Sequence, residues 1–301
     1  IVLQQINFYK PDIIYFGNVD LVTNNFISEI KKLKFIKILI GFHCAPFNNR
    51  IFTNLNNLDC IVTCTKGYLH MLKNKLNKPI LLMQHSFPVR YSKKKLNRSI
   101  DITFIGSIFV GESLHNKRVN LIFELMKNFK NSFIAINFSK KLLFTLLFRF
   151  FRSIYKFQIF SEIIFIYKII YIYFFSKKPV FGQQMFDIIS DSKILVNTHI
   201  DDTEYAGNMR LFEGTGLGCL VLTDIKKELN NLFKIGKEID VFENEKELIE
   251  KCKFYLSNIQ KINTISLLGQ KKTIENYNYE KRISILDEYI KSKLEKNEKN
   301  L

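Results

Sequence analysis

Residues 208–224, NMRLFEGTGLGCLVLTD, combine groups suited to binding an anion with a carboxylate that could hold a ribose. A β-type run and a short acidic loop precede them, a predicted helix opens at Gly207, and a three-glycine corner leads into an apolar strand at 219–222. In such a unit the free N–H groups of the helix N-terminus face the crevice above a parallel sheet and bind phosphates. Glu213 lies about one and a half turns into the helix, where it could accept ribose hydroxyls. The pattern indicates a sugar-nucleotide site; the alternative is an ordinary helix-strand corner with a solvated glutamate.

The histidines supply candidates for proton transfer. His43, within GFHCAP, ends a predicted strand of the first half and is expected to face a ligand cleft. It is the best candidate for a general base or an acceptor-orienting group, against a structural role. His199 ends a predicted strand directly under the 208–224 segment and is expected to contact the donor. The other histidines are expected at a domain hinge, on a helix surface and in a loop: His85, His70 and His115.

Metal-binding patterns are missing from the sequence. It holds no Asp-x-Asp motif and no group of His, Asp and Glu at metal-ligand spacing. Cys60 and Cys64 are the only closely spaced cysteines, and they match neither a zinc knuckle nor a redox Cys-x-x-Cys. We therefore expect neither a metal nor another cofactor, and we predict buried free thiols in a reducing cytosol.

Composition bounds the class of protein. The 301 residues suffice for two α/β domains or one large domain, and 47% apolar residues provide a core. The formal charge of +17 attracts anionic surfaces. However, the basic residues are spread along the chain, and charge alone does not choose between RNA, phospholipid and an anionic substrate. No signal peptide is visible, and because the first residue is Ile1 we expect a fragment with a truncated N-terminal domain.

The first part of the chain alternates between short apolar runs and amphipathic stretches, which is typical of a parallel sheet covered on both faces. Polar and basic residues 88–99 predict a linker. The predicted strands are 12–16, 37–42, 59–64 and 79–85, with helices near 23–34 and 66–75.

The same order is predicted again beyond the linker. The strands are 101–107, 132–138, 193–198, 219–222 and 238–242, and the helices are one that ends near 128, then 183–192, 245–256, 262–277 and 279–296.

Residues 139–178 interrupt this order with dense apolar and aromatic side chains among which basic ones are set. Glu162 and Lys168 break the longest run, 157–175, whereas a spanning helix needs roughly 18–20 clean apolar residues. Two alternatives stay open. One is a helical pair in a membrane interface, with Lys and Arg meeting headgroups. The other is a helical hairpin packed on the sheet.

The second half of the chain resembles the CgeB-like glycosyltransferases, a bacterial group with the two-domain GT-B fold. The first 95 residues match only in general pattern. The resemblance implies an α/β protein with two Rossmann-like domains and a helical insertion at about 139–178. The motifs that carry it follow the family's order: 101–107 (DITFIGS), 181–199, 208–224, 247–256 and 269–273. The expected parts are an acceptor-side domain at 1–95, a donor-binding domain at 96–278, and a C-terminal helix and tail at 279–301 that pack back toward the first domain.

Several donor-binding residues are implied by this resemblance. Glu213 takes the place of the ribose-binding second glutamate of an E-x7-E signature. The first glutamate would fall at Tyr205, which departs from the pattern, with Glu204 one residue away. Gly106 and Ser107 match the turn that faces the phosphates, Lys117 or Arg118 could neutralise the leaving group, and His199 lies nearby. Backbone N–H groups and a neighbouring cation are expected for the diphosphate: Gly207, Asn208, Met209 and Arg210.

The predicted function is a metal-independent glycosyltransferase that moves a sugar from a nucleoside-diphosphate sugar to a cell-surface glycan, a glycolipid or a protein acceptor. We expect it in the cytoplasm, peripheral at the inner face of the plasma membrane, without a nucleic-acid partner. Two rivals stay open. One is a non-catalytic sugar-nucleotide or glycan-binding protein on a degenerate GT-B scaffold. The other is a basic module that binds RNA or a membrane.

Overall fold

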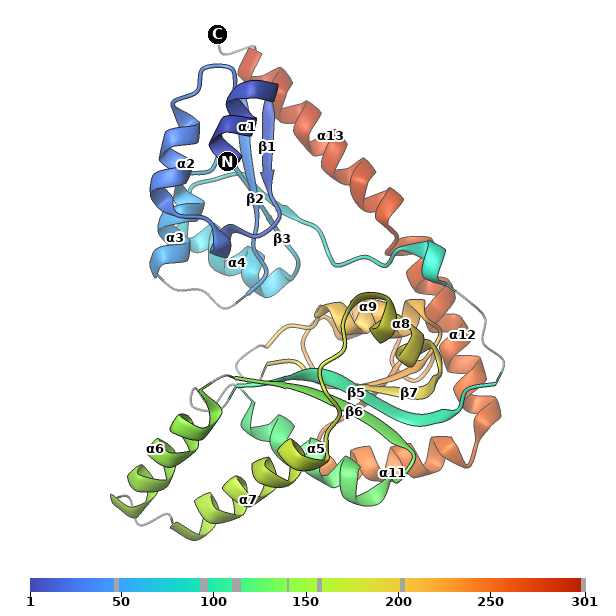
Figure 1. The fold of residues 1–301 in the computed structure, drawn as a ribbon. Coiled ribbons are helices and arrows are strands. Elements are labelled where there is room, and N and C mark those ends of the chain that lie inside the picture. The colour runs from blue at the N-terminus through green and yellow to red at the C-terminus, as the bar shows by residue number, and fades with distance from the viewer. Residues whose placement is uncertain are drawn as a thin grey trace. The chain divides into compact units, whose positions relative to one another are not determined.

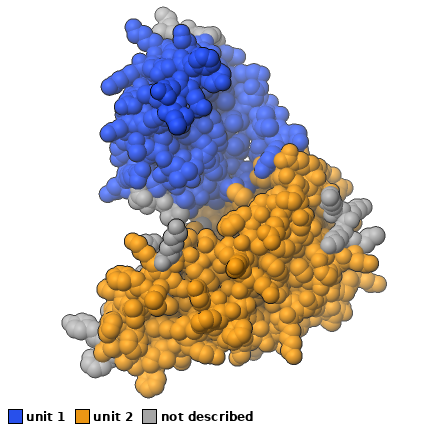
Figure 2. All heavy atoms as spheres, in the orientation of Figure 1, with its two compact units in different colours: residues 1–85, 279–301 blue, residues 86–278 orange. Residues whose placement is uncertain are grey.

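The chain forms two compact α/β units (Figure 2). The computed structural model describes residues 1–45, 49–92, 97–109, 115–139, 141–155, 159–200 and 204–298. Unit 1 comprises residues 1–85 and 279–301, and unit 2 comprises residues 86–278.

Unit 1 is built on a four-stranded parallel sheet in the order β1-β2-β3-β4 (Figure 1). Threonines cap two of its helices, since Thr23 Oγ1 accepts from the Phe26 N–H at 3.3 Å and Thr65 Oγ1 from the Tyr68 N–H at 3.2 Å. The strands are β1 (Ile13–Phe16), β2 (Ile38–Phe42), β3 (Cys60–Thr63) and β4 (Ile80–Leu82). The α-helices are α1 (Val2–Tyr9), α2 (Asn24–Lys31), α3 (Asn49–Asn56), α4 (Lys66–Lys75) and α13 (Tyr279–Glu298).

Both faces of this sheet are covered, as its continuous apolar strands require. On one face Leu39 and Ile61 pack against residues of α1 to α4. On the other face Ile38, Ile40 and Val62 pack against α13. The last helix of the chain, α13, therefore covers one face of the sheet that the N-terminal residues form.

Unit 2 contains a five-stranded parallel sheet in the order β6-β5-β7-β8-β9. The chain leaves β5 to one side for β6 and returns to the other side for β7, so the strand order reverses between β5 and β7. Ligands of open α/β sheets bind at the carboxyl ends of the strands beside such a reversal. The strands are β5 (Ile100–Ile108), β6 (Ser132–Phe138), β7 (Ser192–Asn197), β8 (Leu220–Asp224) and β9 (Asp240–Phe242). The α-helices are α5 (Asn116–Asn128), α6 (Leu142–Tyr155), α7 (Ile159–Phe175), α8 (Gly182–Ser190), α9 (Met209–Gly216), α10 (Leu229–Leu232), α11 (Glu245–Leu256) and α12 (Ile259–Asn276).

The three-glycine corner is explained by close packing. A Cβ on Gly214 would lie 2.3 Å from the Leu195 side chain, and one on Gly216 would lie 2.4 Å from the Phe87 ring. Gly218 has φ +73°, a left-handed conformation that glycine adopts without steric cost. These glycines therefore let α9 lie directly on β7 and β8 and end sharply before β8 begins.

Some sequence predictions need correction. The structure adds three short helices that the pattern did not reveal: α1, α3 and α10. β5 continues through Gly106 and Ser107 to Ile108 and pairs with β6 there, so these two residues are not in a turn. β4 ends at Leu82 and not at His85.

Residues 141–155 and 159–175 lie in the predicted apolar stretch and form a helical hairpin of α6 and α7 (Figure 1). Arg149 joins the two helices, with Nε 2.5 Å and Nη2 3.1 Å from the Glu162 carboxylate. Ile169 and Ile172 of α7 are fully buried in the core beside α5. A search of the described residues finds no helix that combines the length and hydropathy needed to span a membrane.

Candidate nucleotide site

A pocket of about 520 Å³ opens at the carboxyl ends of the unit 2 strands, beside the reversal of strand order. Its walls are the segments that follow β7, β8 and β9 and the first turns of α5 and α11. Cations and carboxylates both line it. The lining residues are Lys117, Arg118, Leu121, Thr198, His199, Asp224, Ile225, Lys226, Phe242, Glu243, Asn244 and Glu245.

His199 and Asp224 form a fixed pair in this pocket. Asp224 Oδ1 lies 2.7 Å from His199 Nδ1 and accepts from the His199 backbone N–H at 2.9 Å. Nε2 of the ring accepts from the Gly207 N–H at 3.3 Å, which together with the carboxylate selects the tautomer with the proton on Nδ1. Burial alone would raise the pKa of Asp224, but hydrogen bonds from His199 and the charge of Lys226 hold it below its usual value. The carboxylate is therefore ionised and orients the ring.

Arg118 links the carboxyl ends of β5 and β7 through hydrogen bonds. Its Nε donates to Thr198 Oγ1 at 2.8 Å, and its Nη groups donate to the carbonyls of Ser107, Thr198 and His199 at 2.8, 2.9 and 3.3 Å. Its charge lies at the pocket wall, but its hydrogen bonds hold the end of β5 against the loop after β7. Arg118, which the sequence predicted as a phosphate partner, is therefore held in place by protein acceptors at the pocket wall.

Two lysines supply positive charge at the pocket. Lys117 lies beside Arg118 in the first turn of α5 and not in a loop before the helix, and both residues line the pocket. Lys226 was missed; its Nζ lies 3.8 Å from Asp224 Oδ2 and 3.5 Å from the Ile200 carbonyl, and its side chain is 14% exposed. Asp224 was also missed as a site residue. The sequence contains a signal for Asp224 and Lys226, because they lie at the carboxyl end of an apolar strand. Ligand-binding residues of parallel sheets are commonly found at such strand ends.

The α9 residues lie next to the pocket, and most of their polar groups have protein partners. The Asn208 side chain exchanges hydrogen bonds with Asn197 at 3.0 and 2.8 Å and does not cap the helix. Arg210 donates to the Ile105 carbonyl at 3.2 Å and forms an ion pair with Glu213, which is 5% exposed. The Gly207 N–H binds His199, whereas Met209 is half exposed. None of these α9 residues is among those lining the pocket.

Glu204 lies outside this arrangement. Its carboxylate accepts from Lys227 Nζ at 2.7 Å on the surface, and the hydrogen bond and charge of Lys227 lower its pKa. The neighbouring residues 201–203, which include the two aspartates of the acidic loop, lie outside the described residues.

His43 occupies an almost closed environment in unit 1. It is 1% exposed, its Nδ1 lies 2.9 Å from Asp20 Oδ1, and its Nε2 lies 2.8 Å from the Ala45 carbonyl. Burial lowers the pKa of the ring, and Asp20 and the Ala45 carbonyl offset part of that shift. Because the ring is buried and both of its nitrogens face protein acceptors, the geometry favours the structural alternative for His43 over a general base or an acceptor-orienting group.

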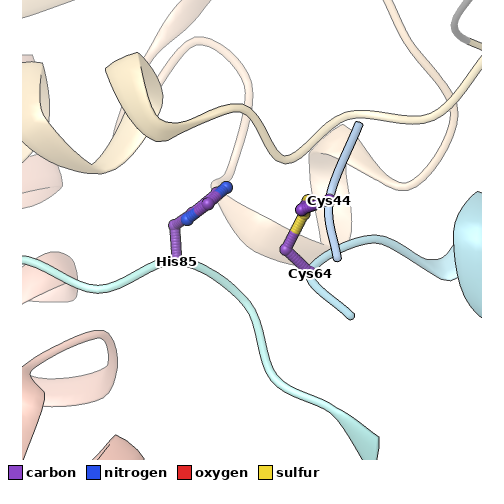
Figure 3. Close-up of side chains that lie close together, drawn as sticks. All are labelled: Cys44, Cys64 and His85. Carbon is purple, nitrogen blue, oxygen red and sulfur yellow. A yellow bond between two sulfur atoms is a disulfide. The ribbon is translucent and has the colours of Figure 1, made fainter. Parts of the chain in front are cut away.

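The cysteines differ from the prediction in one respect. Cys60, Cys219 and Cys252 are buried free thiols, as expected. Cys44 and Cys64, however, are joined as a disulfide, so the prediction of free thiols is wrong for this pair. His85 lies beside them, and burial and the charge of Arg282 lower its pKa to about 4, which leaves the ring neutral at pH 7 (Figure 3). Spacing along the sequence did not reveal this cluster.

Comparisons with known proteins agree on the fold. A family model described as glycosyl transferase-like matches residues 145–288. A sucrose-phosphate synthase from Thermosynechococcus elongatus has a TM-score of 0.64 at 9% identity, covering 97% of this chain and 76% of its own. The Anabaena protein HepE in complex with UDP-glucose has a TM-score of 0.66 at 11% identity, covering 97% and 82%. The pneumococcal O-GlcNAc transferase in complex with UDP and GlcNAc has a TM-score of 0.60 at 11% identity. The match covers 97% of this chain and 59% of the transferase chain.

At these identities the likeness establishes the fold, which is the α/β GT-B fold of glycosyltransferases. No curated protein sequence matches the chain.

Proposed function

We propose that this protein is a GT-B glycosyltransferase that uses a nucleoside-diphosphate sugar. The observation that carries the proposal is the pocket at the carboxyl ends of β7, β8 and β9, with its oriented His199 and its lysines. The glycosyl transferase-like family match over residues 145–288 supports it. So do structural neighbours that were solved with UDP-glucose or with UDP and GlcNAc.

The reaction transfers the anomeric carbon from the diphosphate to an acceptor hydroxyl. The bond from that carbon to the diphosphate oxygen breaks, and a bond from the carbon to the acceptor oxygen forms. The nucleoside diphosphate leaves with the bonding electrons, and the proton of the acceptor hydroxyl passes to the departing diphosphate or to water. Fixed cations beside the departing oxygens stabilise the charge that develops there. Lys117 and Lys226 would do this, with Arg118 adding its field, so the proposed reaction needs neither a metal ion nor another cofactor.

Glu213 is proposed as the ribose-binding residue. It is buried in the second turn of α9, and its partner Arg210 anchors it to β5 through the Ile105 carbonyl. A carboxylate held this way could accept ribose hydroxyls without first becoming ordered, which reduces the entropic cost of binding.

The acceptor class is a finer proposal. We assign the chain to the CgeB-like subtype and propose a cell-surface glycan, a glycolipid or a protein as the acceptor. The alternative of a non-catalytic sugar-nucleotide-binding protein rests on the departure from the signature at Tyr205 and is not favoured. An RNA-binding module is not favoured either, since the site is a compact pocket with acidic residues in its wall.

We further propose that the α6–α7 hairpin docks the enzyme peripherally on an anionic membrane at its cytoplasmic face. Its packed side holds buried residues, whereas its other side exposes large apolar side chains beside exposed basic residues. Soluble proteins rarely expose apolar surface over so many neighbouring residues without a partner. The exposed apolar residues are Leu143, Phe144, Leu147, Phe148, Phe151, Ile154, Phe160, Ile163, Ile164, Tyr167, Ile170, Tyr173, Phe174 and Phe175. The exposed cations are Lys141, Arg152, Lys177 and Lys178.

A donor screen tests the main proposal. Release of nucleoside diphosphate would be measured for a panel of nucleotide sugars, together with calorimetric binding of each nucleoside diphosphate. Lys226→Ala is expected to weaken binding about tenfold or more, because it removes a charge-assisted contact worth roughly 1.5–3 kcal/mol. Lys227→Ala is the matched control, since this neighbouring lysine is 64% exposed and pairs with Glu204 outside the pocket.

Two results would contradict the proposal. One is a folded protein that binds no nucleoside diphosphate. The other is binding that Lys226→Ala and Lys227→Ala weaken equally, which would move the site away from the pocket. Binding without any turnover, across donors and acceptors, would favour the non-catalytic alternative.

A further inference from the structure

Three neighbouring strands of unit 1 bring two sulfur atoms and one imidazole together at the carboxyl edge of their sheet (Figure 3). Cys44 lies just beyond the end of β2, Cys64 just beyond β3, and His85 just beyond β4. These strands are adjacent and parallel, so their carboxyl ends share one edge. The possible ligand atoms all lie within 4.8 Å of one another.

Two thiolates and an imidazole form a ligand set that suits Zn²⁺. Zinc is bound tetrahedrally at about 2.3 Å from sulfur and about 2.0–2.1 Å from nitrogen, which places neighbouring ligand atoms about 3.5 Å apart. That separation falls within the 4.8 Å found here. Three protein ligands leave a fourth position for water or another ligand.

The surroundings of the cluster also suit a metal ion. Cys64 is 1% exposed, whereas Cys44 and His85 are partly exposed. The cluster is therefore shielded from solvent at Cys64 and open to it at Cys44 and His85. The Phe42 ring packs edge-on against His85 with centroids 6.1 Å apart and limits its rotation. Two thiolates neutralise Zn²⁺, so Arg282, whose charge acts on His85, would face no net positive charge at the site.

The disulfide is one of two states open to this pair. The Cα atoms of Cys44 and Cys64 are 5.7 Å apart, a spacing that a disulfide requires and that a shared metal also allows. A phosphine or dithiol reductant converts the disulfide into two thiols. Zn²⁺ then displaces one proton from each thiol and binds both sulfurs, with no change in oxidation state.

We infer that the dithiol form of this protein binds one Zn²⁺ through Cys44, Cys64 and His85, and that the ion ties together the ends of β2, β3 and β4. In the disulfide form the two sulfurs are bonded to each other and supply no thiolate, so this form excludes the metal. This site goes beyond the proposed glycosyl transfer and does not depend on it, since its residues lie in unit 1 and the nucleotide pocket lies in unit 2.

The test uses the full chain, reduced with a phosphine and freed of metal. Titration with Zn²⁺ is expected to give one bound ion per chain by elemental analysis after desalting, and a higher melting temperature. Co²⁺ as the probe is expected to give thiolate-to-cobalt charge-transfer absorption and the intense visible bands of tetrahedral coordination. The oxidised chain, treated in the same way, is expected to retain no metal.

Cys44→Ser, Cys64→Ser and His85→Gln are expected to weaken Zn²⁺ binding by more than the roughly 10–100-fold that follows loss of an outer hydrogen-bond partner. Cys60→Ala is the matched control, because Cys60 is a buried thiol on β3 outside the cluster. The cobalt spectrum of the unmutated chain makes the test independent of whether a variant folds. A reduced chain that binds no Zn²⁺, octahedral cobalt bands, or equal loss of binding in Cys60→Ala would overturn the inference.

Discussion

At the scale of single residues, buried polar groups in unit 2 are held by specific partners. His199 is oriented by Asp224, Arg118 is bound to three backbone carbonyls, and Glu213 is paired with Arg210. Buried charges are costly unless they are paired, so each of these groups depends on its partner. We expect substitutions at them to change stability as well as the proposed binding, so the experiments must separate the two effects.

Glu213→Gln is the sharpest change at the proposed ribose site, because it keeps the shape of the side chain and removes its charge. We expect nucleoside-diphosphate affinity to fall about ten- to a hundredfold, since a hydrogen bond to a charged group contributes roughly 1.5–3 kcal/mol. Calorimetric titration with the nucleoside diphosphate measures this. Because Arg210 loses its ion-pair partner, urea unfolding must be measured alongside. Unchanged affinity in a folded variant would remove Glu213 from the site.

His115 is expected to make stability depend on pH. It is 4% exposed, and its Nδ1 accepts from the Phe109 N–H at 3.0 Å. Burial, with a smaller effect of Arg118, lowers its pKa to about 3. In the unfolded chain a histidine has a pKa near 6.5, so between about pH 6.5 and pH 3 the unfolded state binds more protons. The free energy of unfolding must therefore fall as the pH is lowered through this range.

Urea unfolding at pH 7 and pH 5 measures this contribution of His115. We expect it to cost about 1 kcal/mol of stability at pH 5, after allowance for solvent screening. His115→Asn keeps an acceptor near the Phe109 N–H and cannot gain the proton, so its stability should decline less than that of the unmutated protein. Parallel declines would mean that other groups carry the pH dependence.

At the scale of elements, α6 and α7 have apolar side chains on all sides, but only some of these side chains pack against the core. Ile169 and Ile172 are covered by the core, and the Arg149–Glu162 ion pair holds the two helices together. The opposite side keeps its aromatic and aliphatic groups exposed. One side of the hairpin thus packs on the core, as the packed alternative expected. Its other side exposes apolar groups, as the membrane-interface alternative requires.

Phe148→Ser combined with Phe151→Ser is expected to abolish most binding to anionic vesicles while leaving the melting temperature unchanged. Both rings are largely exposed, at 61% and 66%, so they contribute little to the core. Burying each in lipid would contribute roughly 1.5–3 kcal/mol, at least a tenfold change in partition. Co-sedimentation with phosphatidylglycerol vesicles measures it, and binding should weaken as salt rises.

Phe8→Ser is the control for that experiment, because Phe8 is 80% exposed on α1 in unit 1. It should leave vesicle binding intact. Equal recovery of the unmutated protein in the supernatant, with and without vesicles, would leave the exposed face without a lipid role.

At the scale of the whole molecule, the two proposed sites lie in different units. The pocket proposed to bind the nucleotide is lined by residues of unit 2, and the Cys44, Cys64 and His85 cluster belongs to unit 1. A metal in one unit therefore does not imply a metal in the other.

Sugar transfer is expected to proceed at the same rate with and without added Mg²⁺ or Mn²⁺, because lysines and Arg118 provide the positive charge in the pocket. Initial rates of nucleoside-diphosphate release, measured with each ion and with neither, test this. Saturating Zn²⁺ on the reduced protein serves as the second arm and should affect stability more than rate. A rate that rises severalfold with Mg²⁺ or Mn²⁺ would show that the pocket uses a metal after all.

Local pattern was sufficient for most of the secondary structure. The strand at 132–138 and the helix at 245–256 are found at the predicted residues, because β-branched and aromatic runs and a capped amphipathic helix are local signals. The α/β class followed from their alternation. The helices α1 and α3 were missed, whereas α2, which is equally short, was predicted. α2 follows the capping residue Thr23, a local start signal that α1 lacks.

The tertiary structure decided which residues meet. Asp224 and Lys226 join His199 only because β8 is the neighbour of β7, and Cys44 meets Cys64 and His85 only because β2, β3 and β4 are adjacent. It also decided that Gly106 and Ser107 stay within β5 and that Arg118 binds carbonyls. Strand order depends on how whole faces pack, so residues that are distant in sequence are assembled by contacts that no local pattern encodes.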